Sequence, residues 1–318
     1  MQDSPTFSTM TDGAYRNATD EGGNDRTGRS ATPLPDALRL GQVRLQVSDL
    51  ARSLEYYTSV LGLEARDATG SAASLHAVGE AVPLVELVER PGTTPIGANS
   101  RLGLYHFAIL LPDRAALGRF LAHLAHTGTR IGASDHLVSE ALYLRDPDGL
   151  GIEVYVDRPR SAWRTVDGEL AMATDPLDTE GVLAAGGGAP WTGMPAGTRM
   201  GHVHLHVGDL ARASEFYHAA LGLDTMVWSY TGALFMAAGG YHHHLGLNTW
   251  AGPDAIAARD DEARLLAWQL LLPDAASVAD ARRSVETSGF PTRDAGDGWF
   301  SGDPWGTTLH VLAEPRST

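Results

Sequence analysis

The stretch Asp135–Asp157, DHLVSEALYLRDPDGLGIEVYVD, carries the clearest fold signal in the chain. Two strand-like runs flank the segment DPDG at 146–149, a strong turn signal because Pro restricts φ and Gly permits positive φ. The stretch therefore predicts a strand, a turn and a second strand. Glu153 stands inside the second, apolar run, where a carboxylate is costly unless an ion pair, hydrogen bonds or a metal ion compensates it.

Around this hairpin the chain repeats itself at two levels. The run GQVRLQVSDLARSLEYYTSVLGL at 41–63 returns 160 residues later as GHVHLHVGDLARASEFYHAALGL at 201–223. A fainter repeat relates LYHFAILLPDRAALGRFLAHLAHTG at 104–128 to LLAWQLLLPDAASVADARRSVETSG at 265–289. Each run predicts a strand followed by a helix. The repeats thus predict four units of strand, helix and several strands.

The repeats divide the chain into two structured regions and two connecting ones. Units one and two form an N-terminal domain at 38–160, and units three and four a C-terminal domain at 200–315. Residues 1–37 are polar and lack apolar periodicity, which predicts a disordered tail. Residues 161–199 contain a Gly run and scattered Pro, and they predict a long linker with a short helix around 179–185.

This organisation resembles the vicinal oxygen chelate superfamily, which includes glyoxalase I, bleomycin-resistance proteins and extradiol ring-cleaving dioxygenases. The runs LYHFAILLPD, GHVHLHV and GYHHHLGLNTWAG, together with the hairpin predicted at 135–157, closely resemble the two-domain catechol 2,3-dioxygenase branch of bacteria. The resemblance covers nearly all of 38–315. It implies an α+β fold in which four βαβββ units pair into two cupped half-barrel domains.

Composition limits the classes of partner. The formal net charge of −15 opposes phosphate backbones and argues against nucleic acid, and no apolar run approaches the length of a membrane span. The N-terminus lacks the order of charges typical of a signal peptide, and Cys is absent, so we expect a cytoplasmic protein. The sequence leaves open whether the chain forms a homo-oligomer. Without Cys, a metal needs His or carboxylate ligands.

His106 and Glu153 are the leading metal candidates. They lie on the first and last strands of unit two, the positions at which the resembling family carries ligands. A lone buried His is more often a hydrogen-bonded core residue, and a lone buried Glu is more often half of an ion pair. The two together, in register with the family pattern, favour a metal.

The third ligand is open between two arrangements. In one, units two and three face each other, and His202 (or His204, on the same face) completes the site with His244 nearby. In the other, units one and two supply Gln42 and Glu86, a set similar to that of some glyoxalases. Glu86 is one residue out of register, and such a slip reverses the face of a strand. We therefore expect the cross-domain site.

The resemblance also implies two catalytic residues, His136 and Tyr143. Tyr143 precedes Glu153 by ten residues, as does the Tyr that hydrogen-bonds substrate in extradiol enzymes, and His136 resembles the acid–base group. A His with a near-neutral pKa can take a proton from catechol, and a Tyr hydroxyl can stabilise oxyanion charge.

The implied function is an extradiol dioxygenase that cleaves catechol or a substituted catechol with O2 at a non-haem Fe(II), with Mn(II) or another divalent metal as the alternative. Two other functions occur on the same fold. One is a glyoxalase-type metal-dependent isomerase or lyase, and the other is a metal-free small-molecule-binding protein.

Overall fold

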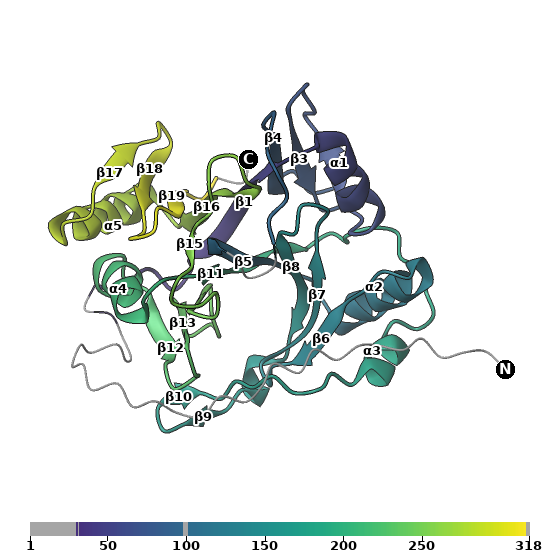
Figure 1. Cartoon of the computed structure of the whole chain (residues 1–318). Helices are drawn as coiled ribbons and strands as arrows, with labels where there is room; N and C mark the ends of the chain where they lie inside the picture. Colours follow the sequence, from purple (N-terminus) through teal and green to yellow (C-terminus); the bar gives the residue numbers. More distant parts are fainter. Residues whose placement is uncertain (1–29, 31, 98–100, 316–318) are drawn as a thin grey trace.

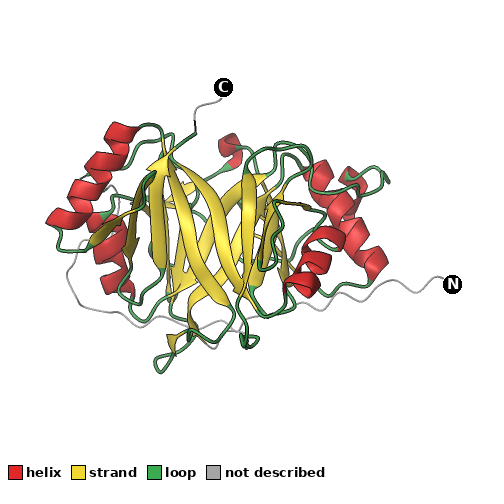
Figure 2. Ribbon diagram, turned by 90° about the horizontal axis from the view of Figure 1, so that it is seen from above, coloured by secondary structure: helices red, strands yellow, loops and turns green. Residues whose placement is uncertain are grey.

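The computed structural model describes residues 30, 32–97 and 101–315, which form two large curled sheets with helices on their outer sides (Figure 1). Viewed at right angles, the strands occupy the middle of the molecule and the helices lie at its two ends (Figure 2). The α+β fold class that the resemblance implies is confirmed, with two cupped sheets.

The first sheet has nine strands, in the order β12-β13-β14-β11-β5-β8-β7-β6 with β15 paired to β5. The strands are β5 (Arg101–Leu110), β6 (Gly132–Asp135), β7 (Ser139–Arg145), β8 (Gly151–Asp157), β11 (Arg199–His206), β12 (Asp224–Val227), β13 (Ala233–Ala237), β14 (Leu245–Asn248) and β15 (Ile256–Ala257). The hairpin predicted within Asp135–Asp157 is β7–β8, as its turn signal indicates.

The second sheet has eight strands, in the order β17-β18-β19-β16-β1-β4-β3-β2. They are β1 (Arg39–Val47), β2 (Glu64–Arg66), β3 (Ala72–His76), β4 (Pro83–Glu89), β16 (Arg264–Leu272), β17 (Thr292–Asp294), β18 (Gly298–Gly302) and β19 (Thr308–Ala313).

These orders show which units pair. Strand β5 of unit two runs antiparallel to β11 of unit three, and β1 of unit one runs antiparallel to β16 of unit four. The first sheet therefore takes four strands from the N-terminal half of the chain and five from the C-terminal half, and the second sheet takes four from each. The cores are continuous, because one cluster of buried residues includes Val43, Ile109, Val203 and Leu270 from all four units.

Each unit begins its helix in the same way. An Asp in extended conformation accepts a hydrogen bond from the backbone N–H three residues on, which satisfies one of the free donors of the first turn. These caps are Asp49, Asp113, Asp209 and Asp274. The helices that follow are α1 (Leu50–Ser59), α2 (Arg114–Thr127), α4 (Leu210–Ser214), which continues as a π-helical turn at Glu215–Ala220, and α5 (Ala275–Thr287).

The linker between the halves is structured. It contains the 3-10 turn Arg160–Ala162, the small hairpin β9–β10 (Thr165–Val166 and Glu169–Leu170) and α3 (Thr179–Ala185), the predicted short helix. Helix α3 packs closely on α2, where a Cβ at Gly118 would lie 2.2 Å from the carbonyl oxygen of Val182. This approach requires glycine at 118.

Ordered structure begins before the expected boundary at residue 38. Leu34 is buried, and its backbone N–H donates to the carbonyl of Gly222 at 2.9 Å. The hydroxyl of Ser30 donates to the carbonyl of His218 at 3.0 Å. The rest of the predicted tail, residues 1–29 and 31, lies outside the described residues. None of the described helices is both long and apolar enough to span a bilayer.

Candidate metal centre

Three adjacent strands of the first sheet bring His106, Glu153 and His202 together. Ala108 of β5 is the register partner of both His202 on β11 and Glu153 on β8, so these three residues form one row across the sheet. His106 precedes Ala108 by two residues and therefore shares its face. The methyl side chain of Ala108 leaves room for the longer side chains on either side to converge.

The three side chains offer nitrogen and oxygen atoms to one point. Nε2 of His106 and Nε2 of His202 each lie 3.0 Å from Oε2 of Glu153, and one ligand atom from each residue falls within 4.8 Å of the others. Adjacent ligands with bonds of about 2.0–2.2 Å to one ion lie roughly this far apart. All three residues are almost fully buried.

The environment of His106 indicates that the three residues are suited to a metal ion. Its Nε2 is buried beside Glu153, yet it makes no hydrogen bond of acceptable geometry. An unsatisfied buried nitrogen costs free energy, which a metal bond would recover. Two imidazoles and one carboxylate are also the ligand set of non-haem iron oxygenases, so these residues fit a divalent metal.

The electrostatics keep the two imidazoles in the form that binds metal. Burial lowers the pKa of His106 and of His202 below the ordinary value, so both are neutral near pH 7. For Glu153, burial acts to raise the pKa, but the two adjacent imidazoles outweigh it and hold the pKa well below its usual range. The triad thus presents two neutral imidazoles and one negative charge.

Tyr143 extends the same row. It is the register partner of Glu153 on β7, and its hydroxyl lies 2.5 Å from Nε2 of His136. Nδ1 of His136 lies 2.7 Å from the carbonyl of Ala173, which can only accept, so Nδ1 carries the proton. Nε2 of neutral His136 is then an acceptor and Tyr143 the donor. Burial, followed by the charge of Glu153, raises the pKa of Tyr143 well above 10, so the hydroxyl stays protonated.

The expectation that His244 lies at the metal centre is not met. Residues 242–244 precede β14 and are not part of a strand, so strict alternation of faces does not apply to them. Nδ1 of His244 accepts the backbone N–H of Ala238 at 3.3 Å, and its ring lies 4.8 Å from that of Tyr241. Its neighbour His243 is the one whose ring lies against His202, 4.1 Å between centroids.

His243 is the residue that the sequence reasoning missed. The signal was the triplet itself, whose members cannot all face one site, but the sequence did not show which member faces His202. His204, the alternative to His202, lies on the same face but bonds elsewhere, since its Nε2 accepts from the side chain of Asn248 at 2.9 Å. Aromatic rings of Tyr105, Phe235 and Trp250 lie within 5.1–5.6 Å of the His204 ring.

The alternative ligand set that includes Gln42 and Glu86 is not assembled. Both residues belong to the second sheet, on β1 and β4. Glu86 forms an ion pair with Arg44 at 3.3 Å, and the backbone N–H of Gln42 donates to the side chain of Gln269.

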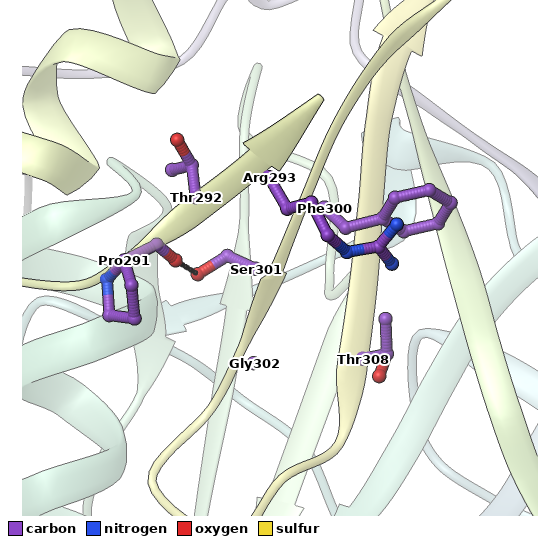
Figure 3. Close-up of a pocket in the computed structure, with 7 residues that line it drawn as sticks. All are labelled: Pro291, Thr292, Arg293, Phe300, Ser301, Gly302 and Thr308. Carbon is purple, nitrogen blue, oxygen red and sulfur yellow. Dashed lines mark hydrogen bonds between the residues drawn. The ribbon is translucent and has the colours of Figure 1, made fainter. Parts of the chain in front are cut away.

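A separate open pocket of about 240 Å³ lies on the second sheet between β17, β18 and β19 (Figure 3). Arg293 extends over the ring of Phe300, 4.6 Å from its centroid, and Ser301 donates to the carbonyl of Pro291. The residues that line this pocket include no His, Asp or Glu, so it is not a metal site.

Comparison with known proteins adds three findings. The chain matches the model of the glyoxalase/bleomycin resistance protein/dioxygenase superfamily over residues 39–154 and 199–306. It is 42% identical over 276 residues to a protein named catechol-2,3-dioxygenase from Bacillus subtilis (strain 168), which covers 86% of this chain and 96% of the relative.

Solved structures show the same fold at low identity. A proposed dioxygenase from Bacillus subtilis subsp. subtilis str. 168 has a TM-score of 0.58 at 13% identity, over 91% of this chain and 87% of that one. Glyoxalase I from Zea mays has a TM-score of 0.51 at 19% identity, over 87% and 92%. At these identities the likeness concerns the fold alone.

Proposed function

Because the chain belongs to the glyoxalase/bleomycin resistance protein/dioxygenase superfamily, we propose that it is an extradiol dioxygenase that opens catechol or a substituted catechol with O2 at a non-haem Fe(II). The observation that carries the proposal is the buried triad His106, Glu153 and His202. This ligand set leaves coordination positions open, as a reaction of two substrates requires. The named relative supports the same reaction, because it is similar to this chain over most of both lengths.

The triad would hold the metal. When bound, the metal would supply binding positions for the diol and for dioxygen, and it would donate electron density to dioxygen. Mn(II) has a similar ligand preference and is the alternative ion. A buried triad with one negative charge and two neutral imidazoles is more stable with a divalent cation bound than without an ion.

The surrounding residues would bind and orient the diol. Tyr143 is protonated and donates to His136, so its hydroxyl oxygen stays fixed beside Glu153, where it can accept a hydrogen bond from a substrate hydroxyl. His136 acts through Tyr143, since both of its nitrogens are already bonded. The rings of Phe235 and Trp250 supply an apolar wall suited to an aromatic substrate.

The experiment loads the purified chain with Fe(II) without oxygen, adds catechol, admits oxygen, and follows oxygen uptake with the yellow colour of a ring-fission product. Resorcinol, whose two hydroxyls cannot chelate one ion, is the control substrate, and Glu153→Gln is the control protein. We expect one O2 consumed per catechol and none with either control.

Two outcomes would reject the proposal. Catechol bound without oxygen uptake by the iron-loaded chain would favour a binding protein. Conversion of a hemithioacetal, with catechol inert, would favour a glyoxalase-type isomerase, although the Gln and Glu that such a set would need lie in the other sheet.

A further inference from the structure

A line of hydrogen bonds runs from the C-terminal end of β8 to His243, whose ring packs against the candidate metal centre. Asp157 ends β8, four residues after Glu153, and its carboxyl group is 25% exposed. Its Oδ1 lies 2.9 Å from Nε2 of His242, a fully buried side chain. Nδ1 of His242 lies 2.7 Å from Nδ1 of His243, and the His243 ring packs on His202.

The chemistry of the partners gives this line a direction. An ionised carboxylate only accepts, so Nε2 of His242 carries a proton that it donates to Asp157. In neutral His242 the other nitrogen, Nδ1, is then an acceptor, and the short contact requires His243 to donate from its Nδ1. Neutral His243 is left with its proton on Nδ1 and a lone pair on Nε2.

The surroundings hold Asp157 and His242 in place. The hydroxyl of Tyr241 also donates to Oδ1 of Asp157, at 3.1 Å, and lies 2.7 Å from the hydroxyl of Tyr155. The Trp163 ring lies 5.4 Å from that of His242, with its indole N–H bonded to the carbonyl of Arg158. The carboxylate of Asp157 accepts two hydrogen bonds, and the ring of His242 packs between the rings of Trp163 and Tyr241. Both groups are therefore held in place.

We infer that Asp157 and His242 are positioning residues that hold His243 against His202 in the Nδ1–H tautomer, with Nε2 left as a hydrogen-bond acceptor for a substrate hydroxyl. The role of this acceptor in catalysis rests on the proposed dioxygenase function. The tautomer itself does not, because it follows from hydrogen bonds within the chain. Residues that hydrogen-bond to the groups lining a metal site typically contribute ~10–100-fold to activity or metal affinity.

The first measurement is the tautomer. The full chain is labelled with ¹⁵N-histidine, and the imidazole ¹⁵N shifts are recorded with the protein metal-free and with Zn(II), which is diamagnetic. His243→Gln assigns the signals. We expect the wild type to show His243 with its proton on Nδ1, and Asp157→Ala and His242→Phe to show a mixture of tautomers. A wild-type His243 protonated on Nε2 would overturn the inference even if neither variant folds.

The second measurement is turnover by the iron-loaded enzyme. We expect Asp157→Ala and His242→Phe to lower kcat for catechol ~10–100-fold, with KM and bound iron near wild type. Asp157→Asn keeps an acceptor oxygen and should recover part of kcat. Unchanged kcat, or a loss that only follows the loss of iron, would contradict the positioning role.

The second sheet provides a matched control. His310 lies 3.1 Å from Asp297 through Nε2, an Asp–His pair far from the triad in sequence and in a different sheet. Asp297→Ala should change neither the His243 tautomer nor kcat. If the wild type shows no ring cleavage, the proposed function fails, while the tautomer measurement still tests the inference.

Discussion

At the scale of single residues, the site depends on which side chains share a row of the sheet. His202, Ala108, Glu153 and Tyr143 are successive register partners on β11, β5, β8 and β7. One row thus carries two candidate metal ligands, the small residue between them and the hydroxyl group beside them. A larger side chain at 108 would separate His202 from Glu153.

Glu153→Gln tests the carboxylate ligand. The substitution keeps the shape of the side chain but removes the negative charge, so we expect loss of most bound metal with the fold intact. Metal is measured by elemental analysis and the fold by circular dichroism. Glu86→Gln, on the second sheet, is the control and should keep wild-type metal. Full metal occupancy in Glu153→Gln would exclude it as a ligand.

Tyr143→Phe tests the hydroxyl next to the metal centre. We expect normal metal content and a kcat about 10²–10⁴-fold lower, because groups that donate or accept protons in the reaction contribute on this scale. Turnover is measured with iron-loaded protein, and Tyr56→Phe on α1 serves as the control for loss of a tyrosine hydroxyl. A rate near wild type would reject the role given to Tyr143.

At the scale of elements, the turn between β7 and β8 is held by a buried carboxylate. Asp146 accepts backbone N–H groups of Asp148 and Leu150 at 2.9 and 2.8 Å, and the hydroxyl of Tyr57 at 3.2 Å. The corresponding turn of unit four repeats the arrangement with Asp303 and Tyr217. Burial outweighs these donors and raises the pKa of Asp146 to about 7.

Asp146→Asn tests the consequence for stability. A carboxyl with a pKa of about 7 when folded and ~3.9 when unfolded stabilises the fold fully below pH ~4, and this contribution is lost as the pH rises to about 7. Three pH units correspond to ~4 kcal/mol as an upper bound. Asn keeps the acceptor oxygen without titrating. We expect the variant to gain stability relative to wild type between pH 4 and 7, as measured by urea unfolding; parallel pH curves would contradict this.

At the scale of the whole molecule, neither half of the chain contains a complete large sheet. The two central antiparallel pairs, β5–β11 and β1–β16, both join residues from different halves. Separation of the halves would expose four central strand edges, which are prone to aggregate. It would also divide the triad, since His106 and Glu153 come from one half and His202 from the other.

Expression of the two halves tests this interdependence. We expect 38–160 and 200–315 produced separately to aggregate or to bind metal weakly, and the two produced together to form a soluble complex with one metal. The readouts are size-exclusion chromatography and elemental analysis. A monomeric, metal-loaded 38–160 would show that the site needs nothing from unit three.

The sequence by itself determined the repeated units and the faces of their strands. The repeat at 41–63 and 201–223 predicts four similar units, and alternation predicts which side chains share a face, because both depend on spacing along one strand. The turn at 146–149 likewise predicts the β7–β8 hairpin. His106 and Glu153 could be named for the same reason, with help from the resemblance to a known family.

The inventory of ligands favoured a pairing of units two and three, but only the tertiary structure placed β11 beside β5 and decided which histidine of 242–244 faces His202. Pairing depends on the edges and packing of distant strands, and no local pattern distinguishes β11 from β1 as the partner of β5. The triplet lies outside regular structure, so contacts with Asp157 and Tyr241 orient its rings rather than alternation. Leu34 was assigned to the tail for the same reason, since its burial comes from residues almost 200 positions away.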